Sequence, residues 1–252
     1  MLTNSLYTKA LFTELFLFLR IMVLPFFCIE SLKDSSLILS EDTSKHIIQV
    51  LRMQKGEKVL LTDGKGKKAE AEIVDDNRKR CAVKIIATEI EKERQHKVAI
   101  AISLIKNASR FEWFLEKATE IGVNEIIPLI CERTEKEKFR FDRMQNILIS
   151  AMVQSQQTWL PVLHEPTDFK KIISETNYQQ KFIAHCLEEK KQQLSSVNNH
   201  FSSIILIGPE GDFAPKEIGL ALQNNFQPVA LGETRLRTET AGLVAAALLC
   251  IH

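Results

Sequence analysis

Two short stretches near the C-terminus, "IGPEGDFAPKEI" at residues 207–218 and "LGETRLRTETAG" at residues 231–242, decide the fold class. Each stretch begins at the end of an apolar run and contains glycine, which is typical of a buried strand that passes through a tight turn into a helix. In the first turn, Gly208 and Gly211 allow the backbone to approach a ligand closely. Pro215 suits the first turn of the helix that follows.

The second turn also joins the end of an apolar strand to a helix through a glycine. Gly232 frees the end of the strand, and Thr238 is a candidate N-cap for the alanine-rich helix. Arg235 and Arg237 are poor choices for a core, so we expect them to face solvent or an anionic partner. Neither turn matches the phosphate loop or the dinucleotide fingerprint. The pattern alone therefore predicts a ligand site at these turns, with two well-capped structural turns as the alternative.

Strands and helices alternate along the C-terminal two thirds of the chain. We predict strands at residues 97–105, 125–131, 181–187, 202–208 and 227–232, and helices at residues 110–123, 142–159, 167–176, 215–225 and 238–252. The helix that starts at Arg110 is the clearest, because its apolar residues recur at spacings of three and four and Gly122 stands where a helix ends. This alternation indicates an α/β domain with a mainly parallel sheet covered on both faces.

Short β-type segments dominate before residue 95. We predict strands at residues 25–29, 36–40, 57–64, 68–74 and 81–90, and one helix at residues 40–53 that begins at Ser40. Gly64 and Gly66 supply the turn of a hairpin. These elements indicate a small barrel-like domain of roughly 70 residues. The charged segment at residues 89–97 is predicted to be a linker.

The net charge is +1, so the overall charge of the protein does not indicate nucleic acid or an acidic membrane as a partner. The segment at residues 45–68 is locally basic, with only Glu57 and Asp63 as acids. Its basic residues are Lys45, Arg52, Lys55, Lys58, Lys65, Lys67 and Lys68. Such a patch can follow phosphates, although a solvated face is the commoner explanation. The five cysteines are scattered and form no C-x-x-C pair, so the sequence predicts neither a metal site nor a disulfide framework, and indicates a reducing cytoplasm.

The N-terminal stretch at residues 11–28 is apolar enough to suggest a membrane segment. Glu14, Arg20 and Pro25 interrupt it, whereas a span requires about 20 predominantly apolar residues. We therefore predict that the folded protein starts near Met22 and that residues 1–21 are an extension, with a weak anchor as the alternative.

Four motifs in order give the chain a specific resemblance. "HIIQVLRMQKGE", "RFEWFLEKATEIGV" with "IIPL", "LIGPEGDF" and "LGETRLRTETA" together resemble the 16S rRNA uridine-N3 methyltransferase family, RsmE, of the SPOUT methyltransferases. The resemblance runs from about Met22 to the C-terminus. It implies a PUA-like RNA-binding β-barrel domain at residues 22–94 and a SPOUT domain with a trefoil knot at residues 95–252.

The resemblance also implies a function and its partners. S-adenosylmethionine would be the cofactor, and the substrate would be 16S rRNA within the small ribosomal subunit. The protein would be a cytoplasmic homodimer without membrane attachment. The apolar C-terminal helix is a candidate for the dimer interface, with a place in the core as the alternative.

Residue roles follow by the same resemblance. The cofactor pocket would use Leu187, Ile207, Gly208, Glu210, Gly211, Leu231, Gly232, Leu236, Arg237 and Thr238. Catalysis would use Arg110 and Arg237 to stabilise the uracil anion, and Glu239 to remove a proton or to orient an arginine. RNA contacts are predicted at His46, Arg52, Lys55, Gln154 and Ser155, with a structural role as the alternative for His46. His185 is predicted either to border the pocket or to lie in the core.

The chain departs from the family pattern at three positions. Val153 and Gln157 replace the glutamate and arginine of an "EQSxR" element, and Ser109 stands where an aspartate commonly precedes the arginine. These changes concern the polar network around the substrate. A catalytically silent RNA-binding protein is therefore the first alternative, but the glycines and "RTETA" are intact. A nucleotide-binding oxidoreductase is the second, and the absent dinucleotide fingerprint argues against it.

Overall fold

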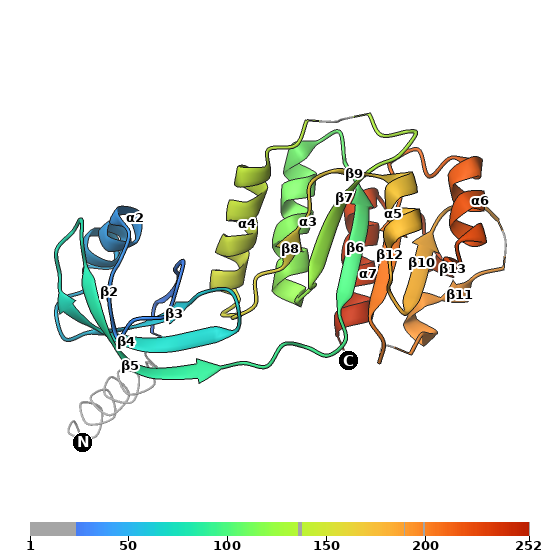
Figure 1. Ribbon diagram of the computed structural model, residues 1–252. Coiled ribbons are helices and arrows are strands. Elements are labelled where there is room, and N and C mark those ends of the chain that lie inside the picture. Colours follow the sequence, from blue (N-terminus) through green and yellow to red (C-terminus); the bar gives the residue numbers. More distant parts are fainter. Residues whose placement is uncertain (1–23, 136–137, 189, 199, 252) are drawn as a thin grey trace, which may run out of the picture. The chain divides into compact units, whose positions relative to one another are not determined.

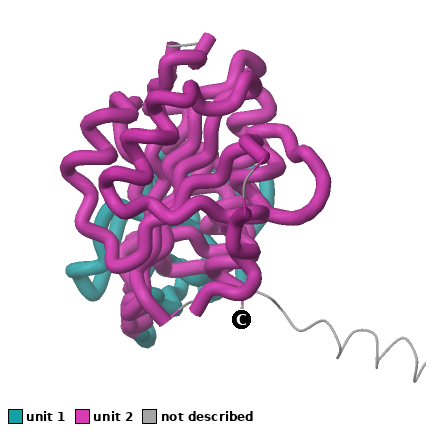
Figure 2. The backbone as a smooth tube through the Cα atoms, turned by 90° about the vertical axis from the view of Figure 1, so that its right-hand side faces the viewer, with its two compact units in different colours: residues 1–61, 68–89 teal, residues 62–67, 90–252 magenta. Residues whose placement is uncertain are grey.

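The computed structural model describes residues 24–135, 138–188, 190–198 and 200–251. The predicted extension at residues 1–21 lies outside them. Within this part of the chain no helix is long and apolar enough to cross a membrane. The chain divides into two compact units, one of residues 1–61 and 68–89 and the other of residues 62–67 and 90–252 (Figure 2). The predicted domain boundaries at residues 21 and 94 stay predictions.

The first unit is a five-stranded sheet with one short helical segment. Its strands are β1 (Phe26–Cys28), β2 (Ser36–Ile38), β3 (Lys58–Thr62), β4 (Lys67–Asp75) and β5 (Ala82–Ile90), in the order β1-β3-β4-β5-β2. Alternate residues of β4 point inward, so Ala69, Ala71 and Ile73 are buried while their neighbours are not. Ile47 from the helical segment is completely buried in the same core.

The predicted helix at residues 40–53 is shorter and less regular than expected. It comprises α2 (Glu41–Lys45) and one π-helical segment, η1 (His46–Val50). Ser40 is its N-cap, since the Ser40 hydroxyl accepts a hydrogen bond from the Thr43 amide at 3.3 Å. The helix ends before Arg52, which has a positive φ of 57°. A non-glycine residue in the left-handed region cannot continue a helix, and propensity did not predict it.

The second unit contains an eight-stranded sheet. Its strands are β6 (Val98–Ser103), β7 (Glu125–Ile130), β8 (Val162–Leu163), β9 (Thr167–Asp168), β10 (Gln180–Ala184), β11 (Gln192–Gln193), β12 (Ser203–Ile207) and β13 (Gln227–Ala230). The order is β11-β13-β10-β12-β6-β7-β8, and β9 also pairs with β7. The pairings described in this sheet are parallel, which confirms the predicted parallel α/β class. The trefoil knot stays a prediction.

Helices cover both faces of this sheet, giving three layers (Figure 1). The helices are α3 (Ala108–Ile121), α4 (Phe141–Gln154), α5 (Phe169–Glu175), α6 (Pro215–Gln223) and α7 (Thr238–Cys250), with a short 3₁₀ helix η2 (Leu194–Ser196). α3, α4 and α7 pack on one face, and α5 and α6 pack on the other. The predicted end of α3 is confirmed, because Gly122 caps it with φ 95°.

The predicted helix at residues 142–159 is wrong in its last turn. α4 ends at Gln154, and Gln156 has φ 56°. The segment beyond it is held by the hairpin turn at residues 62–67, since the Gly66 amide donates to Thr158 O at 3.0 Å. Trp159 lies so close to Gly66 that a Cβ there would be 2.4 Å from the indole. This tertiary contact replaces the helical hydrogen bonds that the local pattern predicted.

We predict that Phe114→Ala lowers the free energy of unfolding by about 3–5 kcal/mol, because Phe114 is fully buried between α3, α7 and the sheet. Urea denaturation followed by circular dichroism measures this change. Trp113→Ala on the same helix is the control, since 42% of Trp113 is exposed and its loss should cost about 1 kcal/mol or less. Equal losses in the two variants would contradict the packing described here.

Candidate functional site

The glycine loop, residues 208–214, follows β12 directly. Its turn is closed by the Asp212 amide, which donates to Pro209 O at 2.9 Å, and Asp212 has φ 63°. Asp212 Oδ2 accepts a hydrogen bond from the Cys186 amide at 2.9 Å, which fixes the loop to the end of β10. A side chain at Gly208 would be tightly packed, because a Cβ would lie 3.0 Å from the Phe213 ring. The glycine therefore allows close packing at this turn.

The arginine loop, residues 231–237, follows β13 and leads into α7. Gly232 has φ 146°, and a Cβ added there would meet nothing within 4 Å. Glycine is needed for this backbone conformation, and the space beside it is open. Arg235 and Arg237 are exposed, as the sequence predicted.

The Thr238 side chain joins the two loops. Thr238 Oγ1 donates to Gly208 O at 3.0 Å, and both residues are buried. Thr238 is the first residue of α7 rather than its N-cap, which is Arg237, so the predicted capping role is wrong. The Thr238 hydroxyl instead donates its hydrogen bond to the glycine loop, because the tertiary structure brings the Gly208 carbonyl close to it. The sequence separation of 30 residues hides this pairing.

Two adjoining cavities lie beyond the carboxyl ends of β10, β12 and β13, where ligands of parallel α/β sheets bind. Their volumes are about 310 Å³ and 390 Å³. Both are lined by Ala184, Cys186, Arg235, Leu236 and Ala241. The first also contacts Ile207, Gly208, Pro209, Glu210, Asp212, Arg237 and Thr238, and the second His185, Lys191, Leu231, Gly232 and Thr234 among others.

Most of the predicted cofactor residues are thus brought together. Leu187 and Gly211 are the exceptions, since neither lines these cavities. β10 ends at Ala184, earlier than predicted, and Leu187 O accepts a hydrogen bond from Lys191 Nζ at 2.7 Å in the following loop. Gly211 O accepts one from Arg133 Nη1 at 2.6 Å.

The sequence reasoning did not assign lining roles to Ala184, Cys186, Arg235, Ala241 or Lys191. Ala184 ends β10, Cys186 and Lys191 follow it, Arg235 lies in the arginine loop and Ala241 lies in the first turn of α7, and these positions were the available signal. His185, left open between pocket and core, is 7% exposed and lines the second cavity.

A larger cavity of about 640 Å³ lies elsewhere in the second unit, around Lys97 and Asn124. These residues precede β6 and β7, so this cavity is at the amino ends of the strands. Its size alone does not make it the better candidate, because the carboxyl ends carry the open glycine turns and the convergent polar groups.

Two predicted catalytic residues, Arg110 and Glu239, form an ion pair at the start of α7, and neither lines the two cavities. Arg110 Nε lies 3.6 Å from Glu239 Oε1, and the side chain of Arg110 is 41% exposed whereas that of Glu239 is 8% exposed. Glu239 Oε2 is buried and makes no hydrogen bond within the described part of the chain. Because Arg237 lines the first cavity and precedes Glu239 by two residues, all three candidates converge at the start of α7.

The predicted RNA-contacting residues fall into two groups. His46, Arg52 and Lys55 are exposed in the first unit, and the His46 ring makes an edge contact with Phe27 at a centroid distance of 5.8 Å. Gln154 and Ser155 lie at the C-terminal end of α4 in the second unit. The two groups therefore belong to different compact units.

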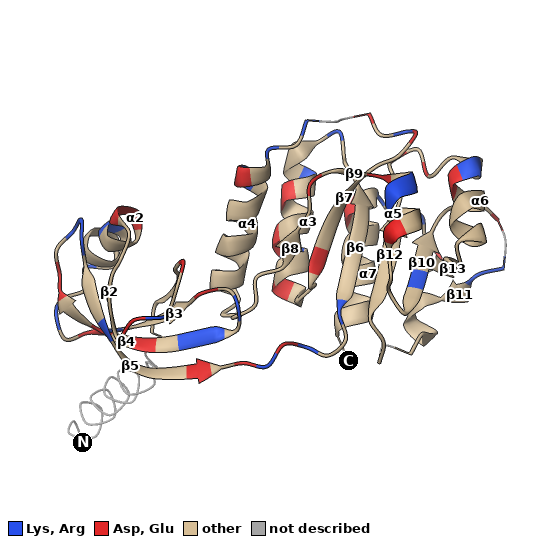
Figure 3. Cartoon of the chain, in the orientation of Figure 1, with Lys and Arg blue, Asp and Glu red and all other residues tan. Residues whose placement is uncertain are grey.

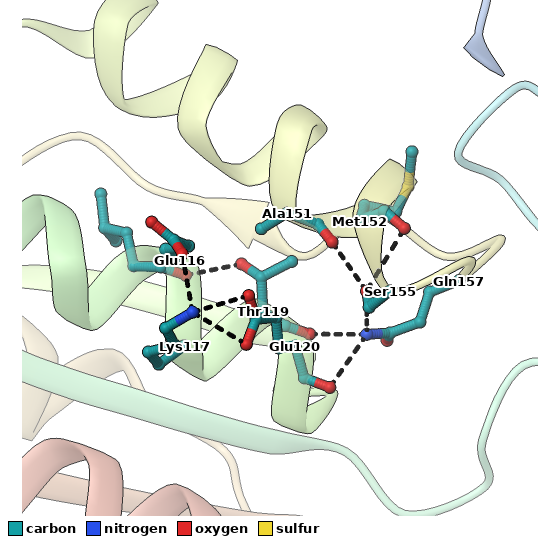
Figure 4. A network of polar contacts seen from close by, with 9 residues as sticks. Glu116, Lys117, Thr119, Glu120, Ala151, Met152, Ser155 and Gln157 are labelled. Atoms are coloured by element: carbon teal, nitrogen blue, oxygen red, sulfur yellow. Dashed lines mark hydrogen bonds and ion pairs between the residues drawn. The ribbon is translucent and has the colours of Figure 1, made fainter. Parts of the chain in front are cut away.

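Gln157, one of the departures from the family pattern, has a structural role (Figure 4). Its Nε2 donates to Thr119 O at 2.8 Å and Glu120 O at 3.2 Å, the last carbonyls of α3. It also donates to Ser155 Oγ at 2.9 Å, while the Ser155 hydroxyl donates to Ala151 O at 2.7 Å. Ser155 and Gln157 therefore join the ends of α3 and α4.

The central strands of the second unit differ in charge from their neighbours, since β7 begins with Glu125 and β10 contains Lys181. β6 and β12 contain no charged residue, as Figure 3 shows for these central strands. Burial raises the pKa of the Cys131 thiol to about 12, so this cysteine is a neutral core residue and not a nucleophile.

Two family models identify the class of protein as an RNA-modifying enzyme. A model of the RNA methyltransferase domain matches residues 91–250, and a model of the RNA methyltransferase PUA domain matches residues 39–86. The chain belongs to this RNA methyltransferase family. The predicted PUA-like domain is thereby confirmed.

Individual relatives agree. Ribosomal RNA small subunit methyltransferase E from Synechocystis is 29% identical over 90% of this chain and 76% of its own length. A crystal structure of the enzyme of that name from Neisseria gonorrhoeae, bound to S-adenosyl methionine, is 27% identical with a TM-score of 0.80, over 89% of this chain and 95% of that one. A structure of a probable rRNA methyltransferase from Porphyromonas gingivalis is 38% identical with a TM-score of 0.85, over 90% and 98% of the two chains.

We predict that Thr238→Val lowers the stability of the protein by about 1–3 kcal/mol, because it leaves the buried Gly208 carbonyl without its donor. Chemical denaturation measures the change. Thr238→Ser retains the hydroxyl and serves as the control, with a smaller loss. Equal stability of Thr238→Val and the unsubstituted protein would contradict the link between the two loops.

Proposed function

We propose that the protein transfers the methyl group of S-adenosylmethionine to N3 of one uridine in the 16S rRNA of the small ribosomal subunit. The observation that carries this proposal is the pair of glycine-containing turns joined by Thr238 around the cavities at the strand ends. Family membership and the S-adenosyl methionine bound to the Neisseria gonorrhoeae relative support it.

The residues around the cavities fit such a cofactor. Ile207, Leu231 and Leu236 supply apolar surface for an adenine ring, and the exposed backbone at Gly232 offers polar groups to its edge. Cavities of 310 Å³ and 390 Å³ that share a wall are of the size that small ligands occupy. When bound, the cofactor supplies an electrophilic methyl group on a sulfonium.

The chemistry at uracil defines what the protein must do. N3 carries a proton, and the nitrogen becomes an effective nucleophile only when that proton leaves. The N3 lone pair then forms the new bond to the methyl carbon, and the electrons of the carbon–sulfur bond return to sulfur. Arg110 and Arg237 would stabilise the negative charge that spreads onto the uracil oxygens. The Glu239 carboxylate, 3.6 Å from Arg110, would hold this arginine or accept the N3 proton.

RNA recognition would be shared by both units. The exposed His46, Arg52 and Lys55 of the first unit are suited to phosphate contacts, and Gln154 at the end of α4 would add contacts in the second. Ser155 is already engaged with Ala151 O and Gln157, so its predicted role in RNA binding would be limited to a shared hydroxyl.

We also propose that the protein acts as a homodimer in the cytoplasm. α7 is apolar around most of its circumference, and Leu243, Val244 and Ala247 on its outer side are only half-buried. A helix that is hydrophobic all round is normally buried, so a second subunit covering this side fits the sequence of α7. Analytical ultracentrifugation of the protein tests this state.

We predict that the protein methylates unmodified small ribosomal subunits at a single nucleotide. Incubation with labelled S-adenosylmethionine followed by mass spectrometry of nucleosides should identify 3-methyluridine. A different methylated nucleoside would contradict the uridine-N3 assignment. Cofactor binding without any methyl transfer would instead favour the silent RNA-binding protein.

We predict that Arg110→Ala and Arg237→Ala each lower kcat by about 10²-fold, because each removes a cation that stabilises the transition state. Single-turnover kinetics at saturating cofactor and substrate measure this loss. Arg143→Ala is the matched control, since Arg143 is also an arginine paired with a glutamate, Glu112, but lies on α4 away from the cavities. Unchanged kcat in the first two variants would remove these arginines from catalysis.

We predict that Arg52→Ala with Lys55→Ala weakens rRNA binding and reduces its dependence on salt, because two phosphate contacts are lost. The slope of log K against log salt should fall by roughly 2. Lys33→Ala with Lys92→Ala is a control that removes the same charge from positions without a predicted RNA contact. An unchanged slope in the first variant would contradict the assignment.

A further inference from the structure

The glycine loop is tied to a part of the sheet that its own strand does not touch. In the strand order, β6 lies between β12, which leads into the glycine loop, and β7. Two strand spacings separate β12 from β7, a distance of about 9.5 Å. Ladder hydrogen bonds span only one strand spacing, so they do not join β12 to β7, whereas a long side chain can connect the segments that follow these strands.

The end of β7 offers a well-ordered attachment point. Residues 131–134 form the β7 turn, in which the Thr134 amide donates to Cys131 O at 3.0 Å. Thr134 Oγ1 accepts from the Cys131 amide at 2.8 Å and lies 2.9 Å from Ser103 Oγ at the end of β6. The turn is thus closed internally and hydrogen-bonded to the neighbouring strand.

Glu217 on α6 makes the connection. It is 8% exposed, and its two carboxylate oxygens accept hydrogen bonds from different segments. Oε1 accepts from the Glu132 amide of the β7 turn at 2.9 Å, and Oε2 accepts from the Ala214 amide at the end of the glycine loop at 2.8 Å. Capping of α6 accounts for the bond to Ala214 but not for the bond to Glu132, which lies 85 residues away.

Arg133 adds a second connection from the same turn. Its Nη1 donates to Gly211 O at 2.6 Å, in the middle of the glycine loop. A third contact, Lys216 Nζ to Glu132 Oε2 at 2.7 Å, has a largely exposed lysine side chain and is a weak surface ion pair. Glu217 therefore holds the C-terminal end of the loop that lines the first cavity, and the exposed Arg133 holds its middle.

We propose that Glu217 and Arg133 are positioning residues that hold the glycine loop in the conformation that binds the cofactor. The inference rests on the proposed function. Neither residue needs to touch the cofactor; they bond the backbone of Gly211 and Ala214, and so act on Gly208 and Glu210, which line the cavity in the same loop. A loop that is preorganised in this way binds its ligand more tightly, because less conformational entropy is lost on binding.

The test uses the full-length protein with Glu217→Gln, Arg133→Met and, as control, Lys216→Met. Glutamine has one acceptor oxygen, so it cannot serve both backbone amides, and its own NH₂ group opposes one of them. We expect the Kd for S-adenosylmethionine, measured by calorimetry, to rise about tenfold in Glu217→Gln and about threefold in Arg133→Met. It should stay within about twofold in Lys216→Met.

Two further readouts separate positioning from a general loss of stability. The KM for S-adenosylmethionine should rise with the Kd while kcat at saturating cofactor stays within about twofold. Amide hydrogen exchange of residues 208–214 should become faster in Glu217→Gln, measured without cofactor. Faster exchange with higher Kd and KM supports the proposal.

An unchanged Kd in Glu217→Gln and Arg133→Met, with only a lower melting temperature, would overturn the proposal and leave Glu217 as a helix cap. If the unsubstituted protein fails to bind S-adenosylmethionine, the proposed function falls and this inference falls with it. If the unsubstituted protein binds and the variants bind equally well, this inference alone is wrong.

Discussion

Parallel pairing of β10 with both β12 and β13 is the constraint on which the candidate site depends. Ala184 at the end of β10 lies opposite Ile207 on one side and Val229 on the other. Since all three strands run in the same direction, the loops that follow them leave the sheet at one edge. The cavities, the Thr238–Gly208 hydrogen bond and the start of α7 all follow from that common edge.

Polar side chains that are buried or half-buried hold this edge together through backbone groups. The Thr238 hydroxyl donates to Gly208 O, the Glu217 carboxylate accepts from two amides, and the Asp212 carboxylate accepts from the Cys186 amide. Hydrogen bonds of this kind matter because an unpaired backbone group in a buried loop destabilises the loop by the full cost of its desolvation. Glu239 differs from them: its carboxylate is buried, faces Arg110 and keeps one oxygen unbonded within the described chain.

Local patterns predicted the elements well where burial has a simple period. The stripe of Phe111, Phe114 and Leu115 predicted α3, and Gly122 predicted its end. The same reasoning failed at the end of α4, where Gly66 of the turn at residues 62–67 donates a hydrogen bond to Thr158 O and packs against Trp159. It also failed to find β8, β9 and β11, which are two residues each and are defined only by their partners. Such short strands have no periodicity to detect.

The sequence by itself determined the α/β class, the order of the elements, the two glycine turns and, through its motifs, the resemblance to a methyltransferase family. These features are local or are carried by residue identity, so a single pass along the chain contains them. Only the tertiary structure decided that Thr238 bonds to Gly208, that Glu217 reaches the turn after β7 and that Arg110 pairs with Glu239. The partners in these pairs are 30 to more than 100 residues apart, and their contacts exist because strand order, not sequence distance, sets which loops meet.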